Sequence, residues 1–444
     1  MKKNLGFTLI ELMIAMVIGL ILMLGIASIF SNTTNNIRLQ RGIANIQDTG
    51  RISYDLLKTD IANAGALYGS SINIQIAQDG QMPQRSVTSF FVTPGDTYQG
   101  NDENARTNTL GTSSANSGLF YGLPTITDIA ARAAREFPPI DTLPNAYRIS
   151  ARYFIQGHEC TTVAACVPAL TVDGAARNFA GATAATLAAG GAVGQRVVGA
   201  DVLTVRHLVG NGASIASATT GVTPVYTLQP GALARLGLTA YPGRLANRLV
   251  MMADIDRAAI YRGSFNATGT TFTLTGAPTT DSGAFGFSAE KNSRIFDMEN
   301  QFLTVTYFLQ NVADPNVPGR IIAALMRQEN GRDLEEIARG VERLDFRYKV
   351  GEFNRRSGWL TADEVSNLAG TACPPQAIDT VEDACGWRDV SVVEVGFLVN
   401  TVDDVQIPDT TVTYTMNQVN GAVAAGSTLR REFRFSVPIR AWQQ

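Results

Sequence analysis

The sequence has little of the side-chain chemistry that most enzyme sites need. It contains only two histidines in 444 residues, and only 17% of its residues are charged. It has no H-E-x-x-H, G-x-S-x-G or P-loop pattern, so no zinc hydrolase, serine hydrolase or nucleotide site is indicated. Its formal net charge of −3 gives no electrostatic basis for non-specific binding of nucleic acid. We therefore expect no enzyme, no cofactor, no metal site and no nucleic-acid partner.

Cysteine is also scarce, and its four copies lie in two close pairs. Cys160 is near Cys166, and Cys373 is near Cys385. The absence of a C-x-x-C spacing argues against a zinc site. An even number of cysteines behind an export segment is typical of disulfides formed in an oxidising compartment. We therefore expect the disulfides Cys160–Cys166 and Cys373–Cys385, with four buried thiols as the alternative.

One long apolar run follows two lysines at the start of the chain. Residues 7–30 carry a single charge, Glu11, and as a helix they span roughly 36 Å, enough to cross a bilayer. Lys2 and Lys3 predict a cytoplasmic N-terminus and an exported head. A cleaved secretory signal and an ordinary signal anchor are two interpretations. However, the run is too long for the first, and the second does not explain Glu11.

The motif G-F-T-L-I-E, residues 6–11, resembles the N-terminal signature of type IV prepilins. The resemblance implies a leader, residues 1–6, that prepilin peptidase removes between Gly6 and Phe7 before it methylates the new amine of Phe7. It also gives Glu11 a role, because a carboxylate in lipid is tolerated only when it is protonated or paired. The partner that the family implies is the N-terminal amine of the adjacent subunit, which would set the axial register of assembly.

The helix is expected to continue well past the membrane segment. Small and apolar residues recur at steps of three and four, which predicts one helix from Phe7 to about Ala64 that ends at Gly65 and is roughly 87 Å long. Residues 31–65 would form an amphipathic half that packs on a globular head. The polar residues 31–36 are poor helix formers and mark the expected position of any bend. The predicted buried stripe consists of Ile43, Ile46, Gly50, Tyr54, Leu57, Ile61 and Ala64.

The stretch QDTGRISYDLLKTDIANAG resembles the post-membrane helix of PilW-type minor pilins, with Arg51, Asp60, Ala64 and Gly65 at recurring positions. We interpret Arg51 and Asp60 themselves as parts of a solvated helix face. Later blocks continue the resemblance in order along most of the chain: residues 199–212, 247–265, 334–351, 391–401 and 430–440. The family often has a cysteine in the second block, where this chain has Ala253-Asp254-Ile255-Asp256, so we expect no disulfide there.

The rest of the chain, residues 66–444, is predicted to form a β-rich head. Several later segments alternate apolar and polar residues, as strands with one dry and one wet face do, and Pro438 fits an edge strand at the end. Polar and Ala/Gly-rich stretches predict loop insertions at about 77–146 and 174–200. The predicted fold is α+β and pilin-like, a long N-terminal helix packed on an antiparallel sheet. The inward faces are expected to be Leu303, Val305, Tyr307 and Leu309; Leu344, Phe346, Tyr348 and Val350; Val393, Val395, Phe397 and Val399; and Phe433, Phe435, Val437 and Ile439.

The remaining polar candidates have simple structural explanations. His158 lies beside Cys160 in the expected disulfide loop, and His207 is expected in a strand. The Asn101-Asp102-Glu103 cluster and Asp403-Asp404 lack EF-hand spacing, and their acids are expected to be solvated. The C-terminal arginines are expected to form a charged outward face rather than a DNA site; they are Arg430, Arg431, Arg434 and Arg440.

The resemblance implies a minor type IV pilin of the PilW type that helps to prime pilus assembly at the tip, in a system for adhesion and twitching motility. The implied partners are prepilin peptidase, other minor pilins, the major pilin, the inner-membrane assembly machinery and membrane lipid. The protein would sit in a Gram-negative inner membrane with a periplasmic head and then join the pilus. A J-type pseudopilin of type II secretion and a tip adhesin are the alternatives. An anchored enzyme is disfavoured by the missing catalytic residues.

Overall fold

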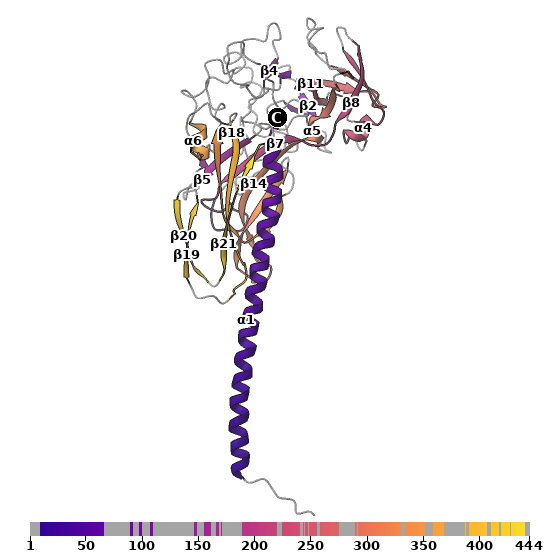
Figure 1. Ribbon diagram of the computed structural model, residues 1–444. Helices are drawn as coiled ribbons and strands as arrows, with labels where there is room; N and C mark the ends of the chain where they lie inside the picture. The colour runs from indigo at the N-terminus through magenta and orange to yellow at the C-terminus, as the bar shows by residue number, and fades with distance from the viewer. Residues whose placement is uncertain are drawn as a thin grey trace, which may run out of the picture.

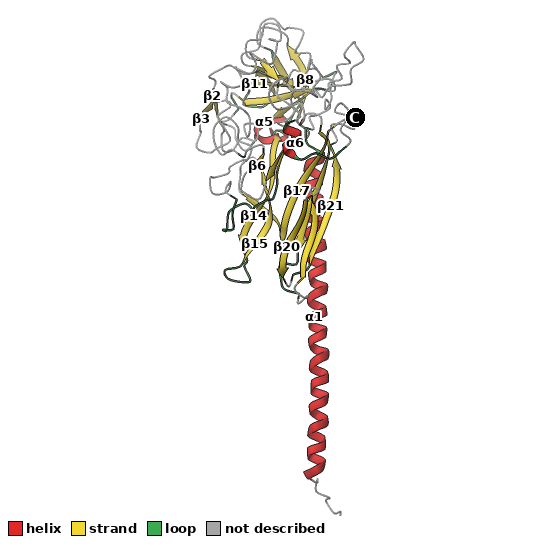
Figure 2. Ribbon diagram, turned by 90° about the vertical axis from the view of Figure 1, so that its left-hand side faces the viewer, coloured by secondary structure: helices red, strands yellow, loops and turns green. Residues whose placement is uncertain are grey.

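The computed structural model consists of one very long helix and a β-rich head (Figure 1). The lower part of the helix protrudes from the head, and its upper part lies along the sheets (Figure 2). The structure describes residues 9–65, 89–91, 97–99, 107–109, 146–148, 155–160, 166–167, 170, 189–219, 224–239, 243, 245–246, 248–254, 258–274, 289–290, 292–329, 334–350, 358–367, 387, 390–405, 410–416, 419–426 and 428–439.

Helix α1 (Leu9–Ala62) is uninterrupted, and it continues through the polar residues 31–36 that were named as the position of any bend. The hydroxyl groups of Thr33 and Thr34 donate to the carbonyl oxygens one turn earlier, at 2.8 and 2.9 Å, so these side chains are satisfied within the helix. The predicted stop at Gly65 is confirmed. Its φ of 70° takes the chain out of the helix, and its N–H donates to the Arg206 carbonyl at 2.9 Å.

Two antiparallel sheets form the part of the head that receives the helix. The last strand of the chain, β21, lies at the edge of its sheet, as the position of Pro438 predicted, and Pro438 is its final residue. One sheet has the order β17 (Val341–Val350), β18 (Val390–Asn400) and β21 (Arg430–Pro438). The other has the order β16 (Leu334–Arg339), β15 (Ile321–Glu329), β14 (Phe302–Ala313), β7 (Val202–Leu208), β5 (Ile155–Cys160) and β6 (Cys166–Val167).

The inner faces of both sheets and the upper part of α1 share one hydrophobic core. The predicted inward faces of β17 and β18 are buried throughout, and Phe433 and Phe435 of β21 pack against the same core. The expectation of one wet face is wrong for β14, because Thr306 and Phe308 on its second face are also fully buried. Phe308 belongs to a second cluster that includes the Cys160–Cys166 pair, so this sheet is covered on both sides.

A separate small barrel, here called the accessory barrel (residues 213–297), occupies the far end of the head (Figure 1). Its strands pair antiparallel in the order β10-β13-β8-β9-β12-β11, and the pairing of β11 with β10 closes the ring. Alternate side chains fill its interior, as in other small barrels. The strands are β8 (Ala213–Thr219), β9 (Val225–Leu228), β10 (Arg248–Ala253), β11 (Ala258–Phe265), β12 (Thr271–Leu274) and β13 (Arg294–Asp297).

The chain leaves the six-stranded sheet to form the accessory barrel, and it returns to that sheet beside the point where it left. Strand β7 ends at Leu208, β14 begins at Phe302, and these two residues are direct partners in the sheet. The N–H of Val209 donates to the carbonyl of Gln301 at 2.7 Å. These paired residues form the connection between the barrel and the sheet, here called the neck. The barrel strands therefore form an insertion between two neighbouring strands.

Short elements complete the described structure. Much of the two predicted loop insertions lies outside the described residues; of the second one, 189–200 is described and contacts β14 through the Val197 N–H, which donates to the Leu309 carbonyl at 3.0 Å. The short elements are α4 (Ala232–Arg235), α5 (Met298–Gln301), α6 (Ala362–Ser366), β1 (Ser89–Phe91) and β4 (Ala146–Arg148) beside β11, and the hairpins β2 (Thr97–Gln99)–β3 (Thr107–Thr109) and β19 (Thr410–Met416)–β20 (Val419–Gly426).

Candidate functional site: the assembly helix and its attachment to the head

The protruding half of α1 exposes large apolar side chains on all its sides. Leu9 is 78% exposed and Phe30 is 74% exposed, and the large apolar residues between them are also exposed. Among the described residues, α1 is the one helix that is long and apolar enough to cross a membrane. Glu11 lies on this segment, whereas Gly6 and Phe7 lie outside the described residues. Such a surface must be covered by lipid or by other helices, so it is the candidate assembly surface.

The upper half of α1 approaches the head most closely at two glycines. A Cβ atom at Gly42 would lie 2.9 Å from Cγ2 of Thr401 and from Cγ1 of Val405. A Cβ atom at Gly50 would lie 2.5 Å from Cζ of Phe433. Each glycine weakens the helix by ~1 kcal/mol relative to alanine. The close approach to β21 and to the turn after β18 offsets this cost.

The predicted helical stripe is mostly confirmed. Ile43 is an exception, because it is exposed and the adjacent Gly42 faces the head instead. Tyr54 is half-buried, and its ring meets the edge of the Phe435 ring at a centroid distance of 4.6 Å. The stripe members that are buried as predicted are Ile46, Gly50, Leu57, Ile61 and Ala64.

Asp60 ties the end of α1 to the six-stranded sheet. Its Oδ2 atom accepts a hydrogen bond from the hydroxyl of Tyr307 at 2.6 Å and one from Nε of Arg327 at 2.9 Å. The Asp60 side chain is only 8% exposed, and the Arg327 side chain is 12% exposed. The expectation of a solvated face at Asp60 is therefore wrong. It is correct for Arg51, whose side chain is 83% exposed and which pairs with Asp55 on the next turn.

The charges around this attachment support one another. Burial raises the pKa of the Tyr307 phenol, and the charge of Asp60 raises it further, so the phenol stays protonated and donates. Burial alone would lower the pKa of Arg327, but Tyr307, Asp60 and Glu329 outweigh burial and raise it. Nη1 of Arg327 also contacts Glu329 Oε1 at 2.6 Å and Glu335 Oε2 at 3.5 Å. The helix end is thus held by a network on β14, β15 and β16.

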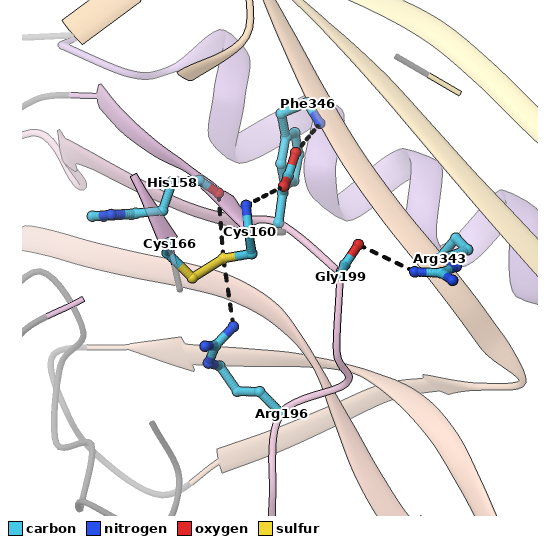
Figure 3. The surroundings of a disulfide bond; sticks show 8 residues. His158, Cys160, Cys166, Arg196, Gly199, Arg343 and Phe346 are labelled. Carbon is cyan, nitrogen blue, oxygen red and sulfur yellow. Dashed lines mark hydrogen bonds between the residues drawn. A yellow bond between two sulfur atoms is a disulfide. The ribbon is translucent and has the colours of Figure 1, made fainter. Parts of the chain in front are cut away.

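The predicted disulfide Cys160–Cys166 is present and closes the short β5–β6 pair (Figure 3). Beside it, Nη1 of Arg196 donates to Sγ of Cys160 at 3.5 Å, and Nη1 of Arg343 donates to the Gly199 carbonyl at 3.3 Å. Cys373 and Cys385 lie outside the described residues, so their pairing stays a prediction.

The buried carboxylate of Asp201 joins the two sheets next to the disulfide. Its Oδ1 accepts from the Cys160 N–H at 2.9 Å, and its Oδ2 accepts from the Phe346 N–H at 3.0 Å. Burial raises the pKa of Asp201, and nearby acids add to the effect. Burial also raises the pKa of Glu159 to about 7 and that of Asp345 to about 6. Burial therefore raises the pKa of all three carboxyl groups at this joint.

The other sequence candidates are structural. His207 lies in β7, and burial lowers its pKa; His158 is buried in β5. Among the described residues, no group of three histidine, cysteine or acidic side chains could hold a metal. Arg430 of the basic C-terminus binds Glu342 at 2.8 and 3.2 Å. Arg434 binds Glu432 at 3.2 Å. The acids at 101–103 and Arg440 lie outside the described residues.

Comparison with known families gives two matches to this chain. Residues 1–27 match the prokaryotic N-terminal methylation motif, and residues 306–441 match the type IV pilus assembly protein W, or PilW, family. Together they identify a PilW-type pilin. No curated protein and no solved structure matches the chain. The methylation motif implies processing by prepilin peptidase and a place among pilus-assembly proteins, and the matches indicate a structural role.

The PilW match covers much of the surface that receives the helix. It includes Tyr307, Arg327, Phe433 and Phe435, which contact or bind α1. The accessory barrel precedes the matched segment. These matches support a type IV pilus-related minor pilin and fit a membrane-anchored one, and the accessory barrel lies outside both matched segments.

Proposed function

We propose that this PilW-type pilin primes pilus assembly and is retained at or near the pilus tip. In this proposal, prepilin peptidase removes residues 1–6 and methylates the amine of Phe7. The mature helix waits in the inner membrane of a Gram-negative cell with its head in the periplasm. It then packs with other minor pilins and the major pilin, and the inner-membrane machinery extrudes the assembly.

The register of assembly depends on Glu11 in this proposal. Glu11 lies on the exposed apolar half of α1, where a carboxylate in lipid is costly. The cationic amine of Phe7 in the next subunit would neutralise it as the helices come together. The observation that carries the proposal is an uninterrupted apolar helix with one acid near its start, behind a prepilin motif.

The tip position is supported by the size and shape of the head. The accessory barrel adds bulk beyond the two sheets that hold the helix. A head of this kind fits poorly in a repeating shaft but can end one. The same reasoning allows a tip adhesin, in which the barrel would contact a surface.

The experiment compares Glu11→Ala and Glu11→Gln with Asp48→Ala, which removes an exposed carboxylate from the same helix outside the apolar segment. We expect the Glu11 variants to be processed and to accumulate in the membrane but to enter sheared filaments at least tenfold less than wild type. Asp48→Ala should enter normally. Intact-mass analysis of wild type should find an N-terminus at a methylated Phe7.

Entry of Glu11→Ala at the wild-type level, or an intact leader, would contradict the mechanism. Counting pili, and measuring attachment and protein secretion, in a deletion strain distinguishes a priming pilin from an adhesin and from a pseudopilin. Loss of pili supports priming, normal pili with lost attachment indicate an adhesin, and normal pili with failed protein secretion indicate a pseudopilin.

A further inference from the structure

Two arginines are the only charged residues of α1 between Glu11 and Asp48. They are Arg38 and Arg41, and both are exposed. They lie three residues apart, so they are neighbours on the helix surface. The exposed apolar residues end at Phe30, and neutral polar residues, 31–36, separate that end from the first arginine.

The height of these arginines above a bilayer follows from the rise of the helix. The hydrocarbon core is ~30 Å thick, which a helix crosses in about 20 residues. A carboxylate is costly at the bilayer centre, so Glu11 belongs at the cytoplasmic boundary. The outer boundary then falls at Ser31. Residues 31–36 rise through ~9 Å, close to the ~5–8 Å of the headgroup layer on each side.

Arg38 therefore stands at the outer edge of the headgroup layer. Its Cα atom lies ~10 Å beyond the boundary at Ser31. Side chains of a helix point back toward its N-terminus, which here is toward the bilayer, and an arginine carries its charge at the end of a long stem. The Arg38 guanidinium thus reaches lipid phosphates. Arg41 stands one turn higher, about one Debye length of ~8 Å from the surface.

The head leaves this part of the helix uncovered. The buried residues of α1 begin at Gly42, where the helix meets Thr401 and Val405 of the head. Gly42 lies one turn above Arg38 on the same side of the helix, so Arg38 lies beneath the head. Asp403 in the same turn of the head contacts Nη2 of Arg320 at 3.4 Å. The two exposed arginines thus lie between the membrane segment and the head.

We propose that Arg38 and Arg41 bind the headgroups of anionic phospholipids at the outer face of the membrane before assembly. This inference rests on the proposed function, in which α1 crosses the membrane and the head lies outside. A guanidinium group binds phosphate oxygens in a bidentate manner. One basic residue near an anionic surface strengthens attachment about fivefold. The contact sets the height of the head above the membrane, and the lipids are left behind when the subunit enters a filament.

The test uses the full-length protein in lipid nanodiscs that contain equal parts of phosphatidylglycerol and phosphatidylcholine with the same acyl chains. Native mass spectrometry of the protein released from the discs counts the lipids that stay bound. Wild type should retain phosphatidylglycerol in excess. Arg38→Gln should lower this excess about fivefold, and Arg41→Gln should lower it less, because Arg41 stands higher. Glutamine has nearly the same helix propensity as arginine, so α1 is preserved.

Two control variants locate the lipid contact. Arg51→Gln removes another exposed arginine of α1, about 30 Å beyond Ser31, and should keep the wild-type excess. Replacement of both Lys2 and Lys3 by glutamine removes the basic residues at the cytoplasmic end. In that background Arg38→Gln should still lower the excess about fivefold.

The proposal is overturned if wild type shows no excess of the anionic lipid, or if the Arg38→Gln/Arg41→Gln double variant keeps the full excess. A double variant that keeps the excess but enters filaments tenfold less would show that the arginines contact another pilin. Alkaline carbonate extraction of wild-type membranes separates this inference from the proposed function. Release of the protein contradicts both, whereas retention without a lipid excess contradicts the lipid contact alone.

Discussion

The carboxylate of Asp60, near the end of the assembly helix, lies 2.6 Å from the hydroxyl of Tyr307 on the head. The lower part of the same helix carries the candidate assembly surface, so the two halves of α1 make different contacts. The Asp60 network fixes the upper end of the helix to the six-stranded sheet. The two helix glycines fix the middle of the helix against Thr401, Val405 and Phe433.

Asp60→Ala should lower the free energy of unfolding of the head by about 1–3 kcal/mol, because it leaves the buried Tyr307 hydroxyl and Nε of Arg327 without their acceptor, while Glu329 and Glu335 still pair with Arg327. Denaturant unfolding of the full chain in detergent measures this change, followed by the fluorescence of its three tryptophans, of which Trp387 is buried. Asp55→Ala is the matched control, because its side chain is 62% exposed, and it should change stability by less than about 0.5 kcal/mol. Equal effects of the two substitutions would show that the network contributes nothing.

Gly50→Ala should destabilise the head by about 1–2 kcal/mol, even though alanine is the better helix former. The added methyl group must displace the Phe433 ring. Gly25→Ala is the control, since no atom lies within 4 Å of the Cβ position there, and it should leave head stability unchanged. The same unfolding measurement applies. A Gly50→Ala protein as stable as wild type would mean that α1 and β21 can move apart without a loss of stability.

The stability of the head should fall as the pH rises from about 4.5 to about 7. Burial first, and then the charge of Asp345, raises the pKa of Glu159 from 4.5 to about 7, so the folded state binds the proton more tightly than the unfolded state does. The stabilisation is complete below the unfolded pKa and is lost through the folded pKa. Asp345, raised from 3.8 to about 6, acts in the same direction.

Glu159→Gln removes one of these titrations. We expect the free energy of unfolding of this variant to depend less steeply on pH between about 4.5 and 7 than that of wild type. Asp55→Asn, on the exposed helix surface, should keep the wild-type dependence. Arg347 opposes the shift, and Asp363 and Glu364 on α6 add to it. A variant with an unchanged pH profile would contradict the assignment to Glu159.

Replacement of both Cys160 and Cys166 by serine should cost roughly 2 kcal/mol, because the closed loop is short. Peptide mass spectrometry of unreduced protein should find the Cys160–Cys166 crosslink and, as the sequence predicts, a Cys373–Cys385 crosslink. Free thiols at the second pair would contradict that prediction. Unchanged stability of the double serine variant would show that the β5–β6 pair holds without its crosslink.

The helix and the sheets that receive it could be predicted because their signals are local. The stripe on α1 and the alternation in β17, β18 and β21 each lie within one element. The two-sided burial of β14 was missed, because the cluster that covers Phe308 is built from residues of other strands. A clue was present, since its polar-face positions include an aromatic residue.

Asp60 was misjudged for a related reason. Its spacing from Gly50, Ser53 and Leu57 places Asp60 on the buried stripe of the helix. A buried acid can be predicted only when the basic residue that pairs with it is known. That partner, Arg327, lies 267 residues further along the chain. The accessory barrel was missed because its strands are short and because the β10–β11 pairing closes the ring without any local signature.

The neck between Leu208 and Phe302 has a consequence for the barrel. Since these two residues pair directly, a tight turn could replace the whole excursion and leave the ladder of β7 and β14 intact. The barrel is therefore a module that could be removed or replaced without altering the helix and the two sheets that hold it. A change confined to the barrel would therefore leave the hydrogen-bond ladder of β7 and β14 as it is.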